Sequence, residues 1–304
     1  IGQNVVCAIM CSGGYNQEDS VIVNKSAIER GLLRVTACRT YREHEKASSN
    51  DVTAFERPRP GECLNTRHAD YSAIEDDGLP VPGGRLTPEC IVIGKTVTSS
   101  PLGEVNSRAK TKKHVTRDQS VPVRHNEAMV VDRVAVATSE EGTQLVRVQL
   151  RCTRVPEVGD KLSSRHSQKG VIGAVVPQED MPFNPATGMV PDIIINPHCM
   201  PSRMSIGHLM EALAAKVAAA EGAPVDGTPF ETPDDLAALL GQRLLAQGHA
   251  ASGMERLCDG TTGELLDAAV FVCPTYYLRL KHMVADKLHA RARGPMQILT
   301  RQPA

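Results

Sequence analysis

Four basic or titratable side chains lie within nine consecutive positions of the chain. They are Lys161, Arg165, His166 and Lys169. Gly159 and Gly170 bound this segment, and Leu162 is almost its only apolar side chain, so we expect a loop rather than a core element. Ammonium groups act as point charges on phosphate and a guanidinium offers two parallel donors, so such a loop is suited to a polyanion. A solvated basic loop is the alternative, because short basic runs also occur without a ligand.

An acidic pair precedes a run of β-branched residues. Glu18 and Asp19 come directly before residues 20–24, which read as the start of a buried strand. Carboxylates at the mouth of a strand can present oxygen ligands to a hard cation such as Mg²⁺. A solvated turn is the commoner explanation of such a pair, so the pair alone does not establish a metal site.

Charge and cysteine content limit the kind of protein this chain can be. Among its 304 residues, 34 Lys and Arg face 35 Asp and Glu, so phosphate binding depends on local patches rather than net charge. The nine cysteines form no Cys-x-x-Cys pair, which argues against a zinc site and against a secreted disulfide framework. The sequence shows no signal-like or membrane-length apolar run.

Alternation of apolar and polar residues predicts several strands. Residues 146–152 alternate strictly, and we expect residues 130–137 to pair with them across a turn. Proline and glycine interrupt residues 35–155, which we expect to be β-rich, with residues 96–126 forming a polar loop. Further strands are expected at residues 4–10, 21–24, 171–176 and 192–196.

Three helices are expected from apolar side chains spaced three and four residues apart. The first covers residues 206–217 and ends near Gly222. The second starts at Thr232 as N-cap, followed by a first-turn proline, two acids and a leucine-rich side. The third covers residues 277–288, with Tyr277 and Leu280 on its apolar stripe.

Five motifs, in order along the chain, carry a resemblance to a known family. They are GYNQEDSVIVN at 14–24, GDKLSSRHSQKG at 159–170, NPHCMPSRM at 196–204, PTYYLRLKHMV at 274–284 and HARARGPMQ at 289–297. With these motifs the chain resembles the second-largest, beta-like subunit of multisubunit DNA-directed RNA polymerases. The resemblance is closest to the eukaryotic, archaeal and large-DNA-virus branch, above all to the messenger-RNA polymerase (Pol II-like). Because both ends of the chain look like cuts, we expect an internal fragment of a longer subunit.

The resemblance implies a fold and a domain organisation. It implies a mixed α/β, β-rich chain in which a discontinuous hybrid-binding domain carries an inserted β-rich wall (flap) domain. Residues 1–34 would be the first part of the hybrid-binding domain, residues 35–155 the wall, and residues 156–304 the truncated second part of the hybrid-binding domain.

The resemblance also implies an activity. The chain would belong to the catalytic core of a DNA-directed RNA polymerase, which adds ribonucleoside triphosphates to an RNA 3′ end by two-metal nucleotidyl transfer. Its active site, with Mg²⁺, would be shared with the largest subunit, since the chain lacks an Asp-x-Asp-Gly-Asp run. Implied partners are the largest and smaller polymerase subunits, template DNA, the RNA–DNA hybrid and nucleoside triphosphates, without a membrane. The implied location is the nucleus, with the virion or viral factory of a large DNA virus as the alternative.

The site residues that the resemblance implies fall into three groups. Asp19 matches the acidic position nearest the second Mg²⁺, while Glu18 either adds a carboxylate or only orders the loop. The catalytic and nucleotide- or RNA-binding cations are Lys161, Lys169 and Arg203, with Arg165 as a further binding residue that could instead contact neighbouring backbone. Backbone contacts with nucleic acid are expected from His289, Arg291 and Arg293, although the two arginines could instead bind the largest subunit.

Two departures from the family pattern and two competing functions complete the expectations. Ser167 stands where the family usually has glycine, and Gly13 where serine is more usual. A serine would strain the loop if that position requires a positive φ angle.

One competing function is a non-catalytic nucleic-acid-binding scaffold paralogue, which would not need the full set of cations and carboxylate. The other is a self-sufficient metal-dependent phosphotransferase, which the absent carboxylate cluster disfavours.

Overall fold

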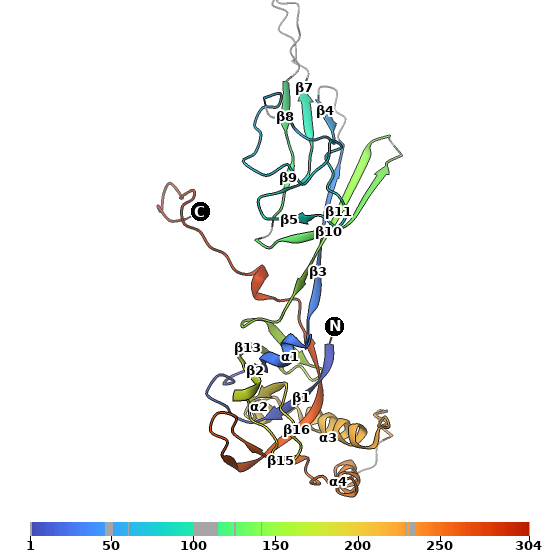
Figure 1. Cartoon of the computed structure of the whole chain (residues 1–304), viewed down its shortest axis with the longest axis vertical. Helices are drawn as coiled ribbons and strands as arrows, with labels where there is room; N and C mark the ends of the chain where they lie inside the picture. Colours follow the sequence, from blue (N-terminus) through green and yellow to red (C-terminus); the bar gives the residue numbers. More distant parts are fainter. Residues whose placement is uncertain are drawn as a thin grey trace, which may run out of the picture. The chain divides into compact units, whose positions relative to one another are not determined.

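The computed structural model describes residues 2–45, 51–59, 61–99, 115–124, 126–140, 142–228, 230–231 and 235–303. The chain divides into two compact units. Residues 1–34 and 155–304 form the first, which we call the split unit. Residues 35–154 form the second, which we call the inserted unit. Figure 1 shows the elements of both units, coloured along the sequence.

The split unit is built on a sheet with the strand order β1-β14-β2-β13-β12-β16-β15. Strand β1 pairs with β14 on one side and with β16 on the other, so six of the seven strands close into a barrel. The pairs β1–β14 and β2–β13 are parallel and the other pairs are antiparallel. The strands are β1 (Gly2–Ile9), β2 (Ser20–Asn24), β12 (Lys161–Ser164), β13 (Lys169–Val176), β14 (Ile193–Ile195), β15 (Met254–Cys258) and β16 (Leu265–Arg279).

Alternate residues of the barrel strands form its core. One buried cluster draws a side chain from every one of the six strands, including Val5, Val21, Leu162, Ile193 and Tyr277. Side chains from all six strands can meet only inside the barrel, because successive residues of a strand point to opposite faces. The predicted strands at residues 4–10, 21–24, 171–176 and 192–196 are therefore confirmed.

Among the described residues, four α-helices accompany this barrel. They are α1 (Lys25–Glu29), α2 (Cys199–Arg203), α3 (Ile206–Glu221) and α4 (Leu236–Ala246), with short 3-10 turns at Gln178–Asp180 and Val284–Asp286. The predicted helix α3 is confirmed, and Gly222 ends it with a φ angle of 70°. Helix α4 begins with Asp235 as its N-cap, whereas Thr232 lies outside the described residues.

The third predicted helix, over residues 277–288, is wrong. Strand β16 continues to Arg279, and only the single 3-10 turn at Val284–Asp286 follows it. Along the last part of β16 the buried residues alternate, including Thr275, Tyr277 and Arg279. This period of two belongs to a barrel strand. Arg279 and Thr275 hide it in the sequence because they are polar residues on the inward side.

The inserted unit contains only strands among its described residues. A four-stranded sheet has the order β3-β11-β10-β5, a three-stranded sheet has the order β4-β7-β8, and β6 pairs with β9 in a two-stranded sheet. The predicted pairing of residues 130–137 with 146–152 is confirmed by antiparallel β10 and β11. The strands are β3 (Val35–His44), β4 (Asp51–Ala54), β5 (Arg85–Leu86), β6 (Ile91–Ile93), β7 (Thr96–Ser99), β8 (Val115–Asp118), β9 (Val121–Pro122), β10 (Met129–Thr138) and β11 (Gln144–Arg154).

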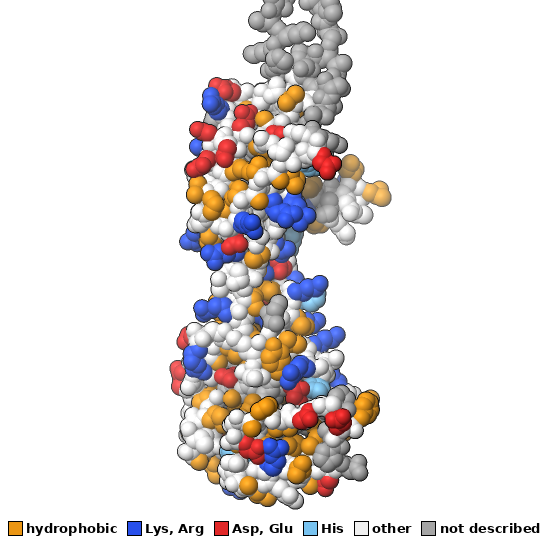
Figure 2. Space-filling model, turned by 90° about the vertical axis from the view of Figure 1, so that its right-hand side faces the viewer, with side chains coloured by type: hydrophobic (Ala, Val, Ile, Leu, Met, Phe, Trp, Pro, Cys, Tyr) orange, Lys and Arg blue, Asp and Glu red, His pale blue; other side chains and the backbone are white. Residues whose placement is uncertain are grey.

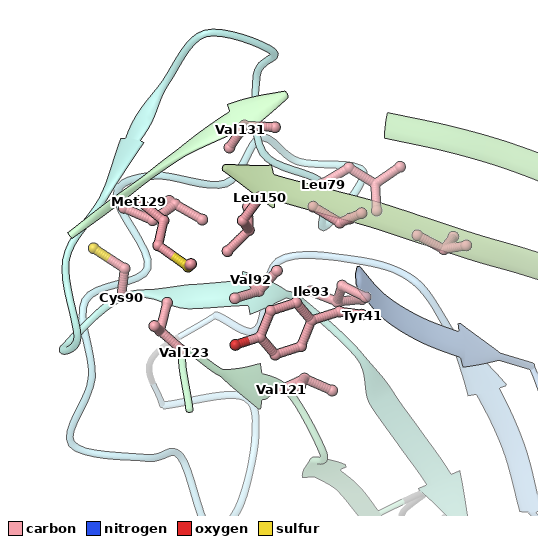
Figure 3. Close-up of a cluster of buried hydrophobic side chains, with 13 residues drawn as sticks. Tyr41, Leu79, Cys90, Val92, Ile93, Val121, Val123, Met129, Val131 and Leu150 are labelled. Atoms are coloured by element: carbon pink, nitrogen blue, oxygen red, sulfur yellow. The ribbon is translucent and has the colours of Figure 1, made fainter. Parts of the chain in front are cut away.

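The inserted unit has its own apolar core. Figure 3 shows that Leu150, Val92 and Tyr41 come from different strands and lie together in it. The prediction of one polar loop over residues 96–126 is wrong for its described part, because β7, β8 and β9 lie there. Residues 100–114 lie outside the described residues. The β-rich fold class is thus confirmed for the chain as described.

Neither unit shows a membrane-spanning helix: within the described ranges, no helix is long and apolar enough to cross a bilayer. Figure 2 shows acidic, basic and apolar side chains intermingled over the visible face, in agreement with the near-equal numbers of acids and bases. Any site for an anion must therefore be sought in local clusters.

Candidate functional site

The basic segment that was expected to form a loop is a β-hairpin. Strands β12 and β13 pair in antiparallel register, with Lys161 opposite Val171 and Ser163 opposite Lys169. Lys161 and Lys169 therefore lie on the same face of the hairpin, two residue positions apart along the ladder. The opposite face, which includes Leu162, is buried in the barrel core. The prediction failed because the tertiary pairing orders a segment that carries little hydrophobic signal.

Ser167 lies in the turn of this hairpin with a φ angle of 58°. The position therefore does require the left-handed region, which glycine adopts more easily than serine. The expected strain at the departure from the family pattern is present in the backbone of this chain.

A buried ion pair anchors the hairpin at its base. The Arg279 Nη2 donates to Asp160 Oδ2 at 2.6 Å, and the two side chains are 1% and 2% exposed. Asp160 also accepts from the backbone N–H groups of Glu157 and Val284. Removing one member of such a buried pair leaves the other charge uncompensated, so both are needed to hold β12 against β16.

The acidic turn is held directly against the hairpin. Glu18 and Asp19 both have positive φ angles, 49° and 45°, immediately before β2. The Val171 N–H donates to the Asp19 carbonyl oxygen at 3.0 Å. A Cβ on Gly170 would lie 2.1 Å from that oxygen, so only glycine fits at this position.

Arg203 connects the acidic turn with the hairpin turn. Its Nη2 forms an ion pair with Asp19 Oδ1, and its Nη1 donates to Gln168 Oε1 at 2.6 Å. Gln168 is buried and its amide donates to the Ser205 hydroxyl. Arg203 ends α2, where Met204 follows in the left-handed region with a φ angle of 52°. The guanidinium is thus oriented by two partners before any ligand is present.

Two pockets flank the Asp19–Arg203 pair. Asp19, Lys169 and Arg203 all line one of them. The other has a volume of about 460 Å³ and is lined by Glu18, Asp19 and His198 among others. Asp19 borders both pockets, and its side chain is 52% exposed while that of Arg203 is 29% exposed. The structure therefore brings Asp19, Lys169 and Arg203 together at one concave surface, with Glu18 beside them.

Arg165 has a different environment from Lys169. Its guanidinium donates to Glu211 Oε1 at 2.6 Å and lies 4.8 Å from the centre of the Tyr276 ring. His166 also pairs with Glu211, through Nε2. Partial burial opposes ionisation of Glu211, but the hydrogen bonds from Arg165 and His166 outweigh it and lower the pKa of this carboxyl. Arg165 thus attaches the hairpin turn to α3, and it does not line the pocket of Lys169 and Arg203.

His208 packs against this ion-pair cluster. Its ring stacks on His166 with 5.5 Å between ring centres, and its Nδ1 is buried with no hydrogen-bond partner in the described structure. Burial is the main cause that lowers the pKa of His208, and the neighbouring His166 lowers it further against the opposing effect of Glu211. The environment of His208 therefore favours its neutral form.

The other expected nucleic-acid residues lie away from these pockets. Lys161 is partly exposed on β12 and lines neither pocket that borders Asp19. His289, Arg291 and Arg293 belong to the exposed segment that follows the 3-10 turn. The Arg291 guanidinium donates to the Pro295 carbonyl. The structure does not bring these three side chains to the acidic turn.

The carboxylates of the acidic turn fit only part of a metal site. Glu18 and Asp19 offer the oxygen donors that Mg²⁺ prefers, and both line the same pocket. Within the described residues, no group of three or more His, Cys, Asp or Glu side chains could hold a metal ion. These residues could therefore contribute one or two ligands to a metal whose other ligands come from elsewhere.

Two supporting residues were not identified from the sequence, and a third was identified only as the end of the basic segment. Gln168 and Ser205 orient Arg203, and Gly170 allows the hairpin to approach Asp19. Gly170 did carry a signal, since it is one of the two glycines that bound the basic segment and glycine permits a close backbone approach. Gln168 carried none, because its role depends on a contact across 35 positions of the sequence.

Comparison with known proteins identifies the family. The model of the family "RNA polymerase Rpb2, domain 6" matches residues 1–304. The chain is 49% identical to the DNA-directed RNA polymerase II subunit RPB2 of Schizosaccharomyces pombe over 303 residues, which cover 99% of this chain and 25% of the relative. It is 46% identical to DNA-directed RNA polymerase II subunit 2 of Arabidopsis thaliana, covering 100% of this chain and 25% of the relative.

An archaeal relative shows a similar match. The DNA-directed RNA polymerase subunit Rpo2 of Sulfolobus acidocaldarius is 44% identical over 304 residues, covering 99% of this chain and 27% of the relative. The chain thus spans about a quarter of the length of these relatives. Because the family model matches the chain throughout and identity is high over nearly its whole length, the chain belongs to the Rpb2 family of second RNA polymerase subunits, in the region of domain 6.

Proposed function

We propose that the chain is part of the catalytic core of a DNA-directed RNA polymerase. In this proposal it contributes to templated addition of ribonucleoside triphosphates to an RNA 3′ end by two-metal nucleotidyl transfer. The active site is shared with the largest subunit, and smaller polymerase subunits, template DNA and the RNA–DNA hybrid are further partners. The eukaryotic relatives favour a nuclear location.

The observation that supports this proposal most strongly is that Asp19, Lys169 and Arg203 line the same pocket. The three residues come from the turn before β2, from the start of β13 and from the end of α2. A carboxylate next to two cations suits a triphosphate that arrives with a divalent ion, because the ion needs oxygen ligands and the phosphates need positive charge. A solvated basic surface would not require the buried Gln168 or the glycine at position 170.

The Asp19–Arg203 ion pair suggests how the ligand is received. Phosphate oxygens can replace the Asp19 carboxylate as partner of the Arg203 guanidinium, which binds both groups in the same planar geometry. Asp19 then faces the incoming Mg²⁺, which the largest subunit also binds in this proposal. Lys169 and Arg203 stabilise the negative charge that develops on the departing pyrophosphate.

The remaining expected residues take supporting roles. Lys161 contacts RNA from the same face of the hairpin as Lys169. Arg165 orders the hairpin turn through Glu211, and its exposed guanidinium remains a further contact for nucleotide or RNA in this proposal. The split unit acts as the hybrid-binding domain and the inserted unit as the wall. His289, Arg291 and Arg293 lie along the nucleic-acid backbone or against the largest subunit.

Single-nucleotide addition by the assembled polymerase tests the proposal. Arg203→Ala and Lys169→Ala should each slow addition about ten- to a hundredfold, since a charge-assisted contact contributes roughly 1.5–3 kcal/mol. Arg203→Lys should restore the rate only in part, because the bidentate geometry is lost. The measurement is the addition rate on preassembled complexes at varied nucleotide concentration.

Arg256→Ala is the matched control, because Arg256 is an exposed arginine on β15 of the same unit. It should leave addition at the wild-type rate. Wild-type rates and nucleotide affinities for both Arg203→Ala and Lys169→Ala would reject the catalytic assignment and favour a nucleic-acid-binding scaffold.

A further inference from the structure

Two parallel strands of the barrel bring a cysteine and an asparagine side by side. Strands β1 and β14 pair in parallel register, with Ile9 opposite Ile195, so the chain leaves both strands at the same edge of the sheet. Cys11 and Asn196 follow there, and Cys11 Sγ lies 3.8 Å from Asn196 Oδ1. Both residues line the pocket of about 460 Å³ that Asp19 also borders. We call it the thiol pocket, defined by Cys11, Asn196, His198 and Cys199.

Cys11 is the accessible thiol of this pocket. All nine cysteines of the chain are free, and only Cys11 and Cys38 are exposed. Cys199 also lines the pocket, but its Sγ donates to the Asn196 carbonyl oxygen at 2.8 Å. Burial is the largest cause of the raised pKa of the Cys199 thiol, against the opposing effect of Arg203. Because a reactive cysteine needs both access and the thiolate form, Cys11 is the nucleophile that the thiol pocket offers.

An imidazole lies beside the Cys11 sulfur. His198 Nδ1 is 3.8 Å from Cys11 Sγ and 2.8 Å from Asn196 Oδ1, and the His198 backbone N–H donates to the same amide oxygen at 2.9 Å. Because an amide oxygen only accepts, Nδ1 carries the proton in this arrangement. The same N–H lies close enough to the sulfur to donate to a thiolate, and such a charge-assisted hydrogen bond stabilises the negative charge.

The amide nitrogen of Asn196 is a donor without a protein partner. Asn196 is 7% exposed, and its oxygen is used by His198. Its Nδ2 forms no hydrogen bond with the residues that the structure describes. The nitrogen is not fully enclosed, and Asn196 lines both pockets beside Asp19, so an acceptor can reach it only from these pockets. A nearly buried donor of this kind indicates that a ligand or a water supplies the acceptor.

We propose that the thiol pocket is a covalent binding site for α,β-unsaturated carbonyl compounds. The Cys11 thiolate attacks the β-carbon and forms a C–S bond, while the π electrons of the C=C bond move toward the carbonyl oxygen. The Asn196 Nδ2–H group donates to that oxygen as its negative charge develops. The α-carbon then takes a proton from solvent, which replaces the proton that the thiol lost, so the addition needs no oxidant and releases no leaving group.

The donor next to the sulfur selects this class of compound. A peroxide or a disulfide would react with Cys11 but would leave the Asn196 amide nitrogen without an acceptor. An adduct at Cys11 would also occupy the pocket that Glu18 and Asp19 line, and would slow nucleotide addition by covering these carboxylates. This consequence depends on the proposed function, whereas formation of the adduct does not.

Rates of modification in the assembled polymerase test the proposal. The enzyme is treated with acrylamide, an α,β-unsaturated amide, or with methyl methanethiosulfonate, which transfers a methylthio group and has no conjugated carbonyl. Mass spectrometry of the peptides with Cys11 and Cys38 then gives the ratio of the two rates for each reagent. The ratio for Cys11 over Cys38 should be about tenfold larger with acrylamide, because one hydrogen bond to the developing oxyanion lowers the barrier by that order. Equal ratios for the two reagents would overturn the proposal.

Two variants assign the effect to its residues. Asn196→Asp keeps the oxygen that accepts from His198 but removes the amide donor, so the preference for acrylamide should disappear while thermal unfolding shows that the enzyme is folded. A folded Asn196→Asp enzyme with the wild-type preference would overturn the role of the amide. Cys11→Ser should add nucleotides at the wild-type rate and keep that rate in acrylamide. A wild-type enzyme with the adduct and an unchanged addition rate would retain the binding site and reject its effect on catalysis.

Discussion

Asp19 is both the ion-pair partner of Arg203 and a carboxylate that borders two pockets. A residue in this position must exchange partners when a ligand with both phosphates and a metal arrives, because it cannot satisfy the guanidinium and the metal equally. Glu18, one position earlier, lines only the larger pocket and has no such cationic partner among the described residues. The two neighbouring acids therefore have different surroundings, and we expect them to have different roles.

Substitution of the two acids should separate these roles. In the assembled enzyme, Asp19→Ala should slow nucleotide addition and raise the concentration of Mg²⁺ or Mn²⁺ needed for half-maximal rate, because one oxygen ligand is lost. Glu18→Ala, the matched control, should change this requirement less. The measurement is a metal titration of the addition rate, and identical titration curves for wild type and Asp19→Ala would place Asp19 away from the ion.

At the level of residues, charge and motifs predicted the charged residues of the site better than the residues that hold them in place. Asp19, Lys169 and Arg203 could be proposed because they match the motifs of the family; the acidic pair and the basic segment also pointed to Asp19 and Lys169, whereas Arg203 came from the resemblance alone. Their convergence could not be predicted from spacing, since Arg203 reaches Asp19 only through the fold of the barrel. The role of Gln168 was hidden for the same reason, because a neutral buried amide has no distinctive sequence pattern.

Among the elements, the hairpin of β12 and β13 contains a strained backbone position at Ser167. Ser167→Gly should raise the free energy of unfolding by about 0.5–1 kcal/mol, because glycine adopts a φ angle of 58° without the steric cost that serine bears. Ser202→Gly in α2 is the matched control and should lower it by a similar amount, since its backbone is helical. Urea unfolding monitored by circular dichroism measures both. A lower midpoint for Ser167→Gly would contradict the strain.

The contact between the hairpin turn and α3 should make stability depend on pH. His208 has a lowered pKa in the folded state, so below its ordinary pKa of about 6.5 the unfolded chain binds a proton that the folded chain refuses. The free energy of unfolding should therefore fall as pH is lowered from 7.5 to 5.5. His208→Gln should flatten this dependence, whereas His282→Gln, at an exposed position, should not. The same slope in His208→Gln and wild type would exclude His208 as its source.

Strand β16 shows why some elements were mispredicted. Its inward residues include Thr275 and Arg279, so the alternation that identifies a strand is not one of hydrophobicity. The spacing of Tyr277 and Leu280 then matches a helix by chance. By contrast, α3 and the β10–β11 pair were predicted correctly because apolar residues recur at the expected spacing along them and their ends carry Gly222 or a turn, although α3 also buries His208 and Lys216.

For the whole molecule, dependence on partners is the main expectation. The described residues contain no cluster that could hold a metal alone, so the isolated chain should not extend an RNA primer on a template with Mg²⁺. A complex reassembled with the largest and smaller subunits should restore extension. The measurement is primer extension resolved by length, and extension by the pure chain would contradict the shared active site.

Arg279 has a consequence for how the two parts of this chain vary through evolution. Its guanidinium donates to the carbonyl oxygens of Leu33 and Val155, at 3.0 and 3.2 Å, as well as to Asp160. Leu33 lies just before the chain leaves the split unit, and Val155 is the first residue after its return. A side chain of the barrel thus binds the backbone at both ends of the inserted segment. Length and sequence changes within the insertion need not alter the barrel, so this junction is a natural place to exchange one insertion for another.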